Sequence, residues 1–99
     1  MYVGIIGTGD YDSELYKDAY EVGRLLAERG AVVVCGGLGG VMEAACKGAS
    51  EAGGVSIGFL PGYSRSEGNP FATYLLPTGL GEMRNLLIIR ASDAVIAIG

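Results

Sequence analysis

Histidine and tryptophan are absent from this sequence, and cysteine occurs only twice, as Cys35 and Cys46, without forming a CxxC pair. A zinc site would therefore have too few ligands, and a cysteine–histidine nucleophile pair would lack its base, so we expect no metal site and no catalysis of that kind. Two thiols without a secretory signal fit a reducing compartment, and the expected location is the cytoplasm.

Positive charge is also scarce. Seven lysine and arginine residues stand against eleven aspartate and glutamate residues, the net charge is −4, and the basic residues form no cluster. Surfaces that bind nucleic acid need a basic patch, so neither DNA nor RNA is an expected partner. No apolar run approaches the ~20 residues that cross a bilayer, and no membrane contact is expected.

Two cofactor sites are excluded by missing motifs. No GK[ST] sequence follows a glycine run, which excludes a P-loop. A pyridoxal-phosphate enzyme needs a Schiff-base lysine in a prepared site, whereas the two lysines, Lys17 and Lys47, fall in the middle of predicted helices. Lysine decarboxylase chemistry is therefore not expected.

Glycine and apolar residues are abundant. The 99 residues include 18 glycines, 3 prolines and 49% hydrophobic residues, as in a globular chain of one domain at most. Residue patterns predict strands at 2–6, 31–35, 55–60, 73–76 and 94–98, and helices at 13–28, 41–52 and 82–91. This alternation predicts an α/β fold with a doubly wound parallel sheet. The polar segment 63–71 is expected to be a mobile loop near a ligand.

A glycine-rich turn separates the second strand from the second helix. Gly36, Gly37, Gly39 and Gly40 fall within five positions, and such a turn leaves N–H groups of the helix free to bind an anion. The turn predicts a site for a phosphorylated small molecule, with a connection that binds nothing as the alternative.

Two residues after this turn are further candidates. Met42 could contact the ligand, although packing in the core is the commoner use of such a residue. Glu43 lies in the first turn of the helix, where a carboxylate favours the helix dipole; reaching a ribose hydroxyl is its alternative role.

The first strand ends in Gly7, Thr8 and Gly9, which form half of a GxGxxG motif. Asp12 stands where the third glycine should be, and the acidic residue expected about twenty positions further on is absent, so the sequence does not predict an NAD site. Asp10, Asp12 and Ser13 are instead expected to cap the first helix.

Arg84 breaks a local rule, because a positive side chain in the first turn of the predicted third helix opposes the helix dipole. A residue that breaks such a rule is a candidate for function, and the alternative is an exposed arginine that the helix tolerates. Ligands of doubly wound sheets bind beyond the carboxyl ends of the strands. We therefore expect residues 7–9, 36–40 and 61–62 and the segment before Arg84 to share one edge.

Four blocks of the sequence are similar to a known superfamily. They are Cys35–Ala44 (CGGLGGVMEA), Lys47–Ala49 (KGA), Thr78–Asn85 (TGLGEMRN) and Ser92–Gly99 (SDAVIAIG). In order and spacing these blocks resemble the "lonely guy" and lysine-decarboxylase-like superfamily, and within it the small bacterial and archaeal proteins related to molybdenum cofactor carriers. The resemblance implies a Rossmann-like fold, usually dimeric, that holds a nucleotide or a nucleotide-like ligand.

The resemblance matches Arg84 to an arginine near the substrate and the glycines of the turn at 36–40 to the first glycine loop of the superfamily. With the residues singled out by pattern and position, the candidate ligand- or phosphate-binding residues are Gly7, Thr8, Gly9, Gly36, Gly37, Gly39, Gly40, Met42, Glu43, Gly79, Arg84 and Asn85. Arg84 is also the one candidate catalytic residue. The expected ligand is a small phosphorylated molecule, either a nucleoside monophosphate or a molybdopterin-type cofactor, bound by a homodimer.

Members of this superfamily use such ligands differently, so several functions stay open. Carriers bind a pterin-based cofactor without catalysis, and this is the function we expect. Phosphoribohydrolases cleave the N-glycosidic bond of nucleoside 5′-monophosphates, with a carboxylate that stabilises oxocarbenium-like charge. A third alternative, a DNA-processing Rossmann module, is disfavoured by the acidic charge.

One signature of the superfamily is not found. The GGxGTxxE block, which carries the main phosphate-binding turn and the catalytic glutamate, would begin at about Gly99. We therefore expect residues 1–99 to be the N-terminal part of a single Rossmann-like nucleotide-binding domain, incomplete at the C-terminus and inactive as an enzyme alone.

Overall fold

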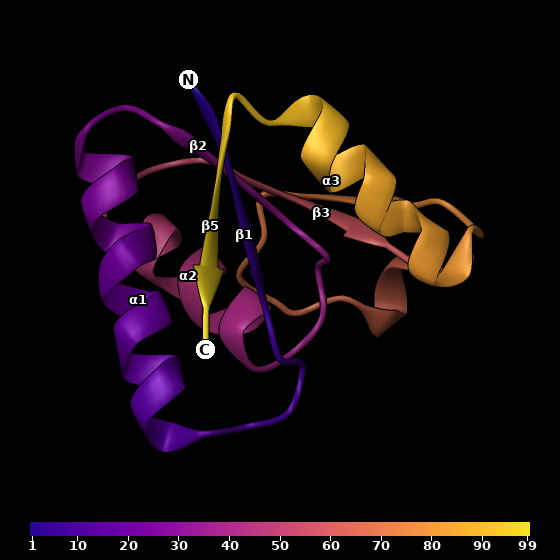
Figure 1. Ribbon diagram of the computed structural model, residues 1–99, viewed down its shortest axis with the longest axis horizontal. Helices are drawn as coiled ribbons and strands as arrows, with labels where there is room; N and C mark the ends of the chain where they lie inside the picture. The colour runs from indigo at the N-terminus through magenta and orange to yellow at the C-terminus, as the bar shows by residue number, and fades with distance from the viewer.

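Five strands form one all-parallel sheet in the computed structural model, which describes all of residues 1–99. The strands are β1 (Tyr2–Gly7), β2 (Val32–Cys35), β3 (Ser56–Leu60), β4 (Tyr74–Pro77) and β5 (Ala94–Ile98). Their order is β4-β3-β2-β1-β5, so the chain starts inside the sheet, moves to one edge and then crosses to the other (Figure 1). Every neighbouring pair is parallel, which confirms the predicted fold class.

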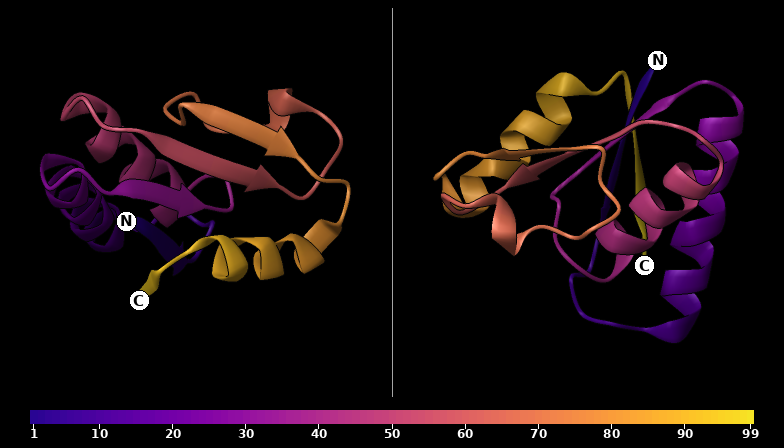
Figure 2. Two further views of the ribbon diagram at one scale, coloured as in Figure 1. Left: turned by 90° about the horizontal axis from the view of Figure 1, so that it is seen from above. Right: turned by 180° about the vertical axis from the view of Figure 1, so that it is seen from behind.

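Helices cover both faces of this sheet (Figure 2). The helices α1 (Ser13–Glu28) and α2 (Val41–Glu51) pack against each other on one face, whereas α3 (Asn85–Ala91) lies on the other. Two 3₁₀ turns, η1 (Arg65–Glu67) and η2 (Gly81–Arg84), belong to the connections around β4. None of the helices has the length and apolar character that crossing a membrane requires.

The ends of α1 follow from the residues that flank it. A side-chain oxygen of Asp12 accepts hydrogen bonds from the N–H groups of Glu14 and Leu15, both at 3.1 Å, and so caps the helix. At the other end, Gly30 adopts a φ of 78°, the left-handed conformation in which helices often end. Both predicted ends of this helix are confirmed, and of the three residues expected to cap it, Asp10, Asp12 and Ser13, only Asp12 does so.

The core lies between the sheet and the layer formed by α1 and α2. Ile5 and Val33 are fully buried on the sheet side of this core. The two helices approach closely at Gly23 and Gly48, where a Cβ atom would collide with the backbone of the facing helix. Glycine at these points therefore lets α1 and α2 pack closely against each other.

The chain differs from the sequence prediction in three places. The predicted helix 82–91 begins as the 3₁₀ turn η2, started by Gly81 with a φ of 59°, and becomes α-helical at Asn85. The segment 63–71, expected to be a mobile surface loop, contains the 3₁₀ turn η1. Its Asn69 is only 5% exposed, and its polar groups are bonded to the backbone. Only the middle of β1 is buried, since Tyr2 and Ile6 at its ends are 45% and 38% exposed.

Candidate functional site

A cavity of about 400 Å³ lies at the carboxyl ends of β1 and β2, facing α3. It is lined by three parts of the chain that are distant in sequence. The β1 region contributes Ile5, Ile6, Gly7 and Gly9, the glycine turn and α2 contribute Gly36, Leu38 and Met42, and η2 with α3 contributes Glu82, Arg84, Asn85, Ile88 and Ile89. This is where doubly wound sheets bind ligands.

Arg84 is the one buried charged side chain of the protein, with 4% of its surface exposed. Its Nε donates to the main-chain carbonyl of Phe59 at 3.0 Å, and its Nη1 donates to a carboxylate oxygen of Glu82 at 3.3 Å. Its Nη2 has no hydrogen-bond partner within the chain and lies against Gly36, where a Cβ would come within 2.7 Å of it. A guanidinium held at one edge and free at the other is suited to bind an anion.

The setting of Arg84 corrects the sequence prediction. Arg84 ends η2 and stands at the N-cap of α3, not within the first turn of a continuous α-helix. The alternative of an exposed arginine is wrong, because the Phe59 carbonyl and the Glu82 carboxylate hold its charge inside the fold. The residue nevertheless lines the cavity, at the edge where it was expected.

Glu82 is the only carboxylate that lines the cavity, and its side chain is 86% exposed. It accepts hydrogen bonds from Arg84 and, at 3.4 Å, from Nδ2 of Asn85. Because Glu82 is exposed, its carboxylate can swing into solvent while the guanidinium of Arg84 stays buried. An anionic ligand can then take the place of Glu82 on the guanidinium.

The two glycine turns of the site contact each other. The N–H of Val41, at the start of α2, donates to the Thr8 carbonyl at 3.0 Å. The sequence predicted that N–H groups at the start of this helix are free to bind an anion, but the N–H of Val41 is already bonded to Thr8. Gly40 adopts a φ of 62°, and a Cβ there would lie 2.5 Å from the Thr8 oxygen, so only glycine fits at this contact.

Asn69 is a residue of the site that sequence reasoning missed. Its main-chain N–H and its Nδ2 donate to the Gly37 carbonyl at 2.8 and 3.3 Å, and Nδ2 also donates to the Leu38 carbonyl at 3.1 Å. Its Oδ1 accepts from the N–H groups of Phe71 and Ala72. Asn69 therefore anchors the glycine turn to the loop after β3. The only signal for it in the sequence is the Asn-Pro dipeptide, a turn signal.

The other predicted residues lie at varying distance from the cavity. Six of the twelve line it: Gly7, Gly9, Gly36, Met42, Arg84 and Asn85. Glu43 does not, because its carboxylate accepts a hydrogen bond from the Tyr16 hydroxyl at 2.9 Å, and Gly79 packs against the ring of Tyr63. Thr8, Gly37, Gly39 and Gly40 belong to the two turns beside the cavity. The part of each in binding stays a prediction.

The apolar lining was not predicted as part of the site. It consists of Ile5, Ile6, Leu38, Ile88 and Ile89. Ile5 and Ile88 are 0% and 1% exposed, so the apolar surface open to the cavity comes mainly from Ile6, Leu38 and Ile89. Apolar residues of a strand and a helix are typical of a core, and only the fold shows that some of them border a cavity.

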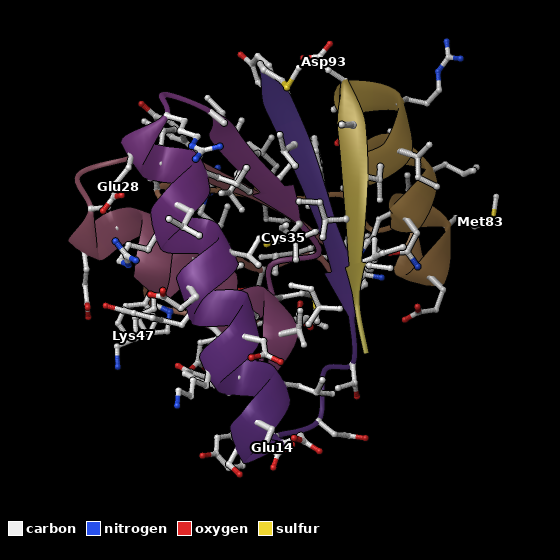
Figure 3. The ribbon with its side chains drawn as sticks, turned by 60° about the vertical axis from the view of Figure 1, so that its left-hand side comes forward. Glu14, Glu28, Cys35, Lys47, Met83 and Asp93 are labelled. Carbon is white, nitrogen blue, oxygen red and sulfur yellow. The ribbon has the colours of Figure 1, made fainter.

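Two buried thiols lie behind the glycine turn. Cys35 ends β2 and points into the interior, whereas Glu14 lies at the surface (Figure 3). Cys46 belongs to α2, and its Sγ is 3.4 Å from that of Cys35. Both thiols are free, and neither residue lines the cavity.

Comparisons with known proteins agree with this architecture. The model of the SLOG cluster4 family matches residues 1–99. A curated protein from Archaeoglobus fulgidus, described as uncharacterized, is 46% identical over 99 residues, which are 100% of this chain and 65% of that protein.

Two solved structures of molybdenum cofactor proteins are similar to the whole chain. The molybdenum cofactor binding protein from the phototrophic bacterium Rippkaea orientalis has a TM-score of 0.95 and 37% identity, covering 99% of this chain and 61% of that one. The molybdenum cofactor carrier protein from Chlamydomonas reinhardtii has a TM-score of 0.89 and 36% identity, covering 99% and 62%. The chain thus spans 61% to 65% of the length of the proteins compared.

A less similar structure belongs to a protein that is named for another function. DNA processing protein A from Helicobacter pylori, described with its single-stranded DNA binding mode, has a TM-score of 0.72 and 26% identity, covering 98% of this chain and 53% of that one. The shared Rossmann-like fold is therefore used by proteins of more than one function.

Proposed function

The chain belongs to the SLOG cluster4 family, and on this premise we propose that it provides the binding site of a carrier for a phosphorylated, pterin-based cofactor of the molybdopterin type. The observation that carries the proposal is the buried guanidinium of Arg84, whose Nη2 is unpaired beside a cavity of about 400 Å³. Two similar structures are named as molybdenum cofactor binding or carrier proteins. Since the chain spans less than two thirds of these proteins, the activity of the whole protein is part of the proposal.

The chemistry of the cavity suits such a ligand. A molybdopterin-type cofactor combines a flat ring system with a phosphate group. The accessible side chains of Ile6 and Ile89, with the thioether of Met42, offer an apolar wall to a ring. Arg84 and the close-approach position at Gly36 offer a place for the phosphate. In this assignment the protein binds and shields the cofactor and carries out no bond-breaking step.

A nucleoside monophosphate hydrolase is the alternative function. It would use the same arginine, but it also needs a carboxylate close to the reacting sugar. Glu82 is the only carboxylate in the cavity lining, and it is paired with Arg84. The residues of this chain therefore support binding better than hydrolysis. The single-stranded DNA function of a distant structural neighbour gains no support from the net charge of −4.

We also propose that the protein works as a homodimer in the cytoplasm. Exposed apolar side chains of η2 and α3, namely Met83, Leu86 and Ile89, are 63%, 55% and 53% exposed and offer a surface for a second copy. Sedimentation velocity tests the dimer, and cell fractionation tests the location.

The function is tested by binding measurements on the full-length protein. Molybdenum cofactor released from a molybdoenzyme, or AMP, is added to the purified protein, and co-elution, melting temperature and release of free adenine are recorded. The expected result is co-elution of the cofactor with a higher melting temperature and no adenine from AMP. A ligand at 100 times its dissociation constant stabilises the folded protein by about 2.7 kcal/mol, which is readily measured.

Matched variants show whether the cavity is responsible. Arg84→Gln removes the charge in the cavity, whereas Arg90→Gln removes an exposed charge from the same helical segment. We expect cofactor binding to be weakened only by the first. Release of adenine from AMP would assign the hydrolase function instead, and failure of both ligands to raise the melting temperature would contradict a phosphate site.

A further inference from the structure

The two cysteines bracket the glycine turn of the site. Cys35 immediately precedes Gly36, and Cys46 lies in α2, eleven residues further along the chain. Their Sγ atoms are 3.4 Å apart and both residues are fully buried. The cofactor site described above does not use either thiol, so the closeness of this pair requires its own explanation.

The surroundings give the two sulfur atoms different characters. The hydrogen bond with Cys46, together with burial, raises the pKa of Cys35, so Cys35 keeps its proton. Hydrogen bonds from Cys35, and then from Ser56 and Asn69, lower the pKa of Cys46 in spite of its burial. Cys46 is thus the more acidic of two adjacent thiols, and the more acidic thiol of such a pair is the one expected to react first as a nucleophile.

Only one layer of side chains separates this pair from the cavity. Leu38 and Met42 pack against the two cysteines, and both also line the cavity. A molecule as small as hydrogen peroxide can therefore reach the sulfur atoms from the cavity when these two side chains move. A ligand in the cavity would block that route.

We propose that Cys35 and Cys46 are a redox-modification site, which hydrogen peroxide converts to a reversible disulfide that weakens ligand binding at the adjacent glycine turn. The Cys46 thiolate attacks one peroxide oxygen and the O–O bond breaks, which leaves a sulfenic acid on Cys46 and, after uptake of a proton, water. The sulfur of Cys35 then displaces the hydroxyl group, its proton leaves with that group as a second water, and the S–S bond forms. Two thiols are oxidised, and one peroxide is reduced to two waters.

The effect on binding follows from how tightly the turn is packed. A disulfide bond is about 2.05 Å long, so the sulfur atoms must approach by about 1.4 Å. Gly36 follows Cys35 directly and packs against the cavity residues, since a Cβ built there would lie 2.7 Å from both Nη2 of Arg84 and Sδ of Met42. A backbone shift at Cys35 that accompanies the closure would therefore be passed on to Arg84 and Met42, two residues that line the cavity. By linkage, a bound ligand should disfavour the disulfide by the same factor.

The disulfide is tested without any ligand. Reduced full-length protein is treated with hydrogen peroxide, and intact mass and alkylatable thiols are measured before and after dithiothreitol. We expect loss of the mass of two hydrogen atoms, loss of both thiols, and recovery of both with dithiothreitol. Thiols that stay alkylatable in the folded protein, or sulfinic and sulfonic acids formed without a disulfide, would overturn the proposal.

Single variants separate the two roles. Cys35→Ser should accumulate a sulfenic acid on Cys46, seen as the mass of one added oxygen and trapped by dimedone. Cys46→Ser should stay unmodified under the same treatment. Circular dichroism checks that both variants fold. The test for the disulfide in the unaltered protein does not depend on these variants. Rapid oxidation of Cys35 in the Cys46→Ser variant would contradict the assigned roles.

The effect on binding rests on the proposed function and is measured separately. After removal of peroxide, the affinity for isolated molybdenum cofactor should be at least tenfold weaker in the oxidised protein and restored by dithiothreitol, which does not repair oxidised methionine. Equal affinity in the two forms would overturn the coupling. If the disulfide forms but reduced protein binds no cofactor, the proposed function fails and the redox site stands.

Discussion

Arg84 donates from Nε to the main-chain carbonyl of Phe59 at 3.0 Å, so a residue at the start of α3 is fixed to the strand β3. This bond joins the helix on one face of the sheet to a strand end. It also turns the free Nη2 toward Gly36, beside the cavity. One arginine thus both positions η2 and supplies the charge of the site, and a substitution at this residue should separate the two effects.

Arg84→Lys is expected to weaken ligand binding more than it weakens the fold. A lysine keeps the charge but has one nitrogen in place of the separate Nε and Nη2 donors, so it cannot reproduce the geometry of both contacts. Loss of a charge-assisted hydrogen bond costs about 1.5–3 kcal/mol of binding free energy, roughly 10- to 100-fold in affinity. Titration with molybdenum cofactor and urea unfolding measure the two effects. Arg90→Lys is the control, and an Arg84→Lys variant with unchanged affinity would contradict this role.

Substitutions at the adjacent residues Gly39 and Gly40 should have different effects, the first on ligand affinity and the second on stability. Gly39 does not adopt a positive φ, and a Cβ there would meet only the Gly9 carbonyl, at 3.4 Å. Gly39→Val should therefore fold, and we expect it to lose ligand affinity because its side chain would crowd the glycine turn beside the cavity. Retained affinity in a folded Gly39→Val variant would contradict the placement of the ligand at this turn.

Gly40→Ala is the matched variant that should damage the fold instead. The residue would keep a φ of 62° with its Cβ 2.5 Å from the Thr8 oxygen. Backbone strain and overpacking together should lower the free energy of unfolding by about 3 kcal/mol. Thermal or urea unfolding measures this loss, and an alanine tolerated at Gly40 would show that the two turns do not meet as described.

Asn69→Ala should loosen the glycine turn from a distance. The variant loses the side-chain bonds to the carbonyls of Gly37 and Leu38 and to the N–H groups of Phe71 and Ala72. Each such bond contributes about 0.5–1.5 kcal/mol, so we expect a loss of about 2 kcal/mol in the free energy of unfolding. Urea unfolding tests this, with the exposed Ser66→Ala of the same loop as control. A loss no greater than that of the control would contradict the anchor.

The sequence predicted the strands and helices around this site better than it predicted the contacts and side chains that line it. Apolar runs and the Asp12 cap are local signals, and they located the strands and α1 correctly. The bond from Arg84 to Phe59 and the anchor from Asn69 join segments that are 25 and 31 to 32 residues apart. No local pattern reports such contacts, because they depend on which strands become neighbours. For the same reason Glu43, expected near a ligand or the helix dipole, could not be matched to Tyr16 beforehand.

The Tyr16–Glu43 hydrogen bond should make the stability of the fold depend on pH in the alkaline range. Burial, and then the bond to Glu43, raises the pKa of Tyr16 from 10.0 to about 12. A group whose pKa is higher in the folded state stabilises the fold fully below its unfolded pKa. That stability should be present below pH 10 and lost as the pH rises through 12, where the ionised tyrosine can no longer donate to the carboxylate.

Tyr16→Phe isolates this contribution, because the other tyrosines, Tyr20 included, are common to both proteins and cancel. At pH 8 the variant should be less stable by about 1 kcal/mol, the contribution of one hydrogen bond. The difference should shrink between pH 10 and 12, since only the unaltered protein loses the bond there. Urea unfolding across this range measures it, with Tyr63→Phe, 90% exposed, as control. A gap that stays constant up to pH 12 would mean that Tyr16 stabilises α1 and α2 by packing alone and that its hydroxyl proton has no part in holding Glu43.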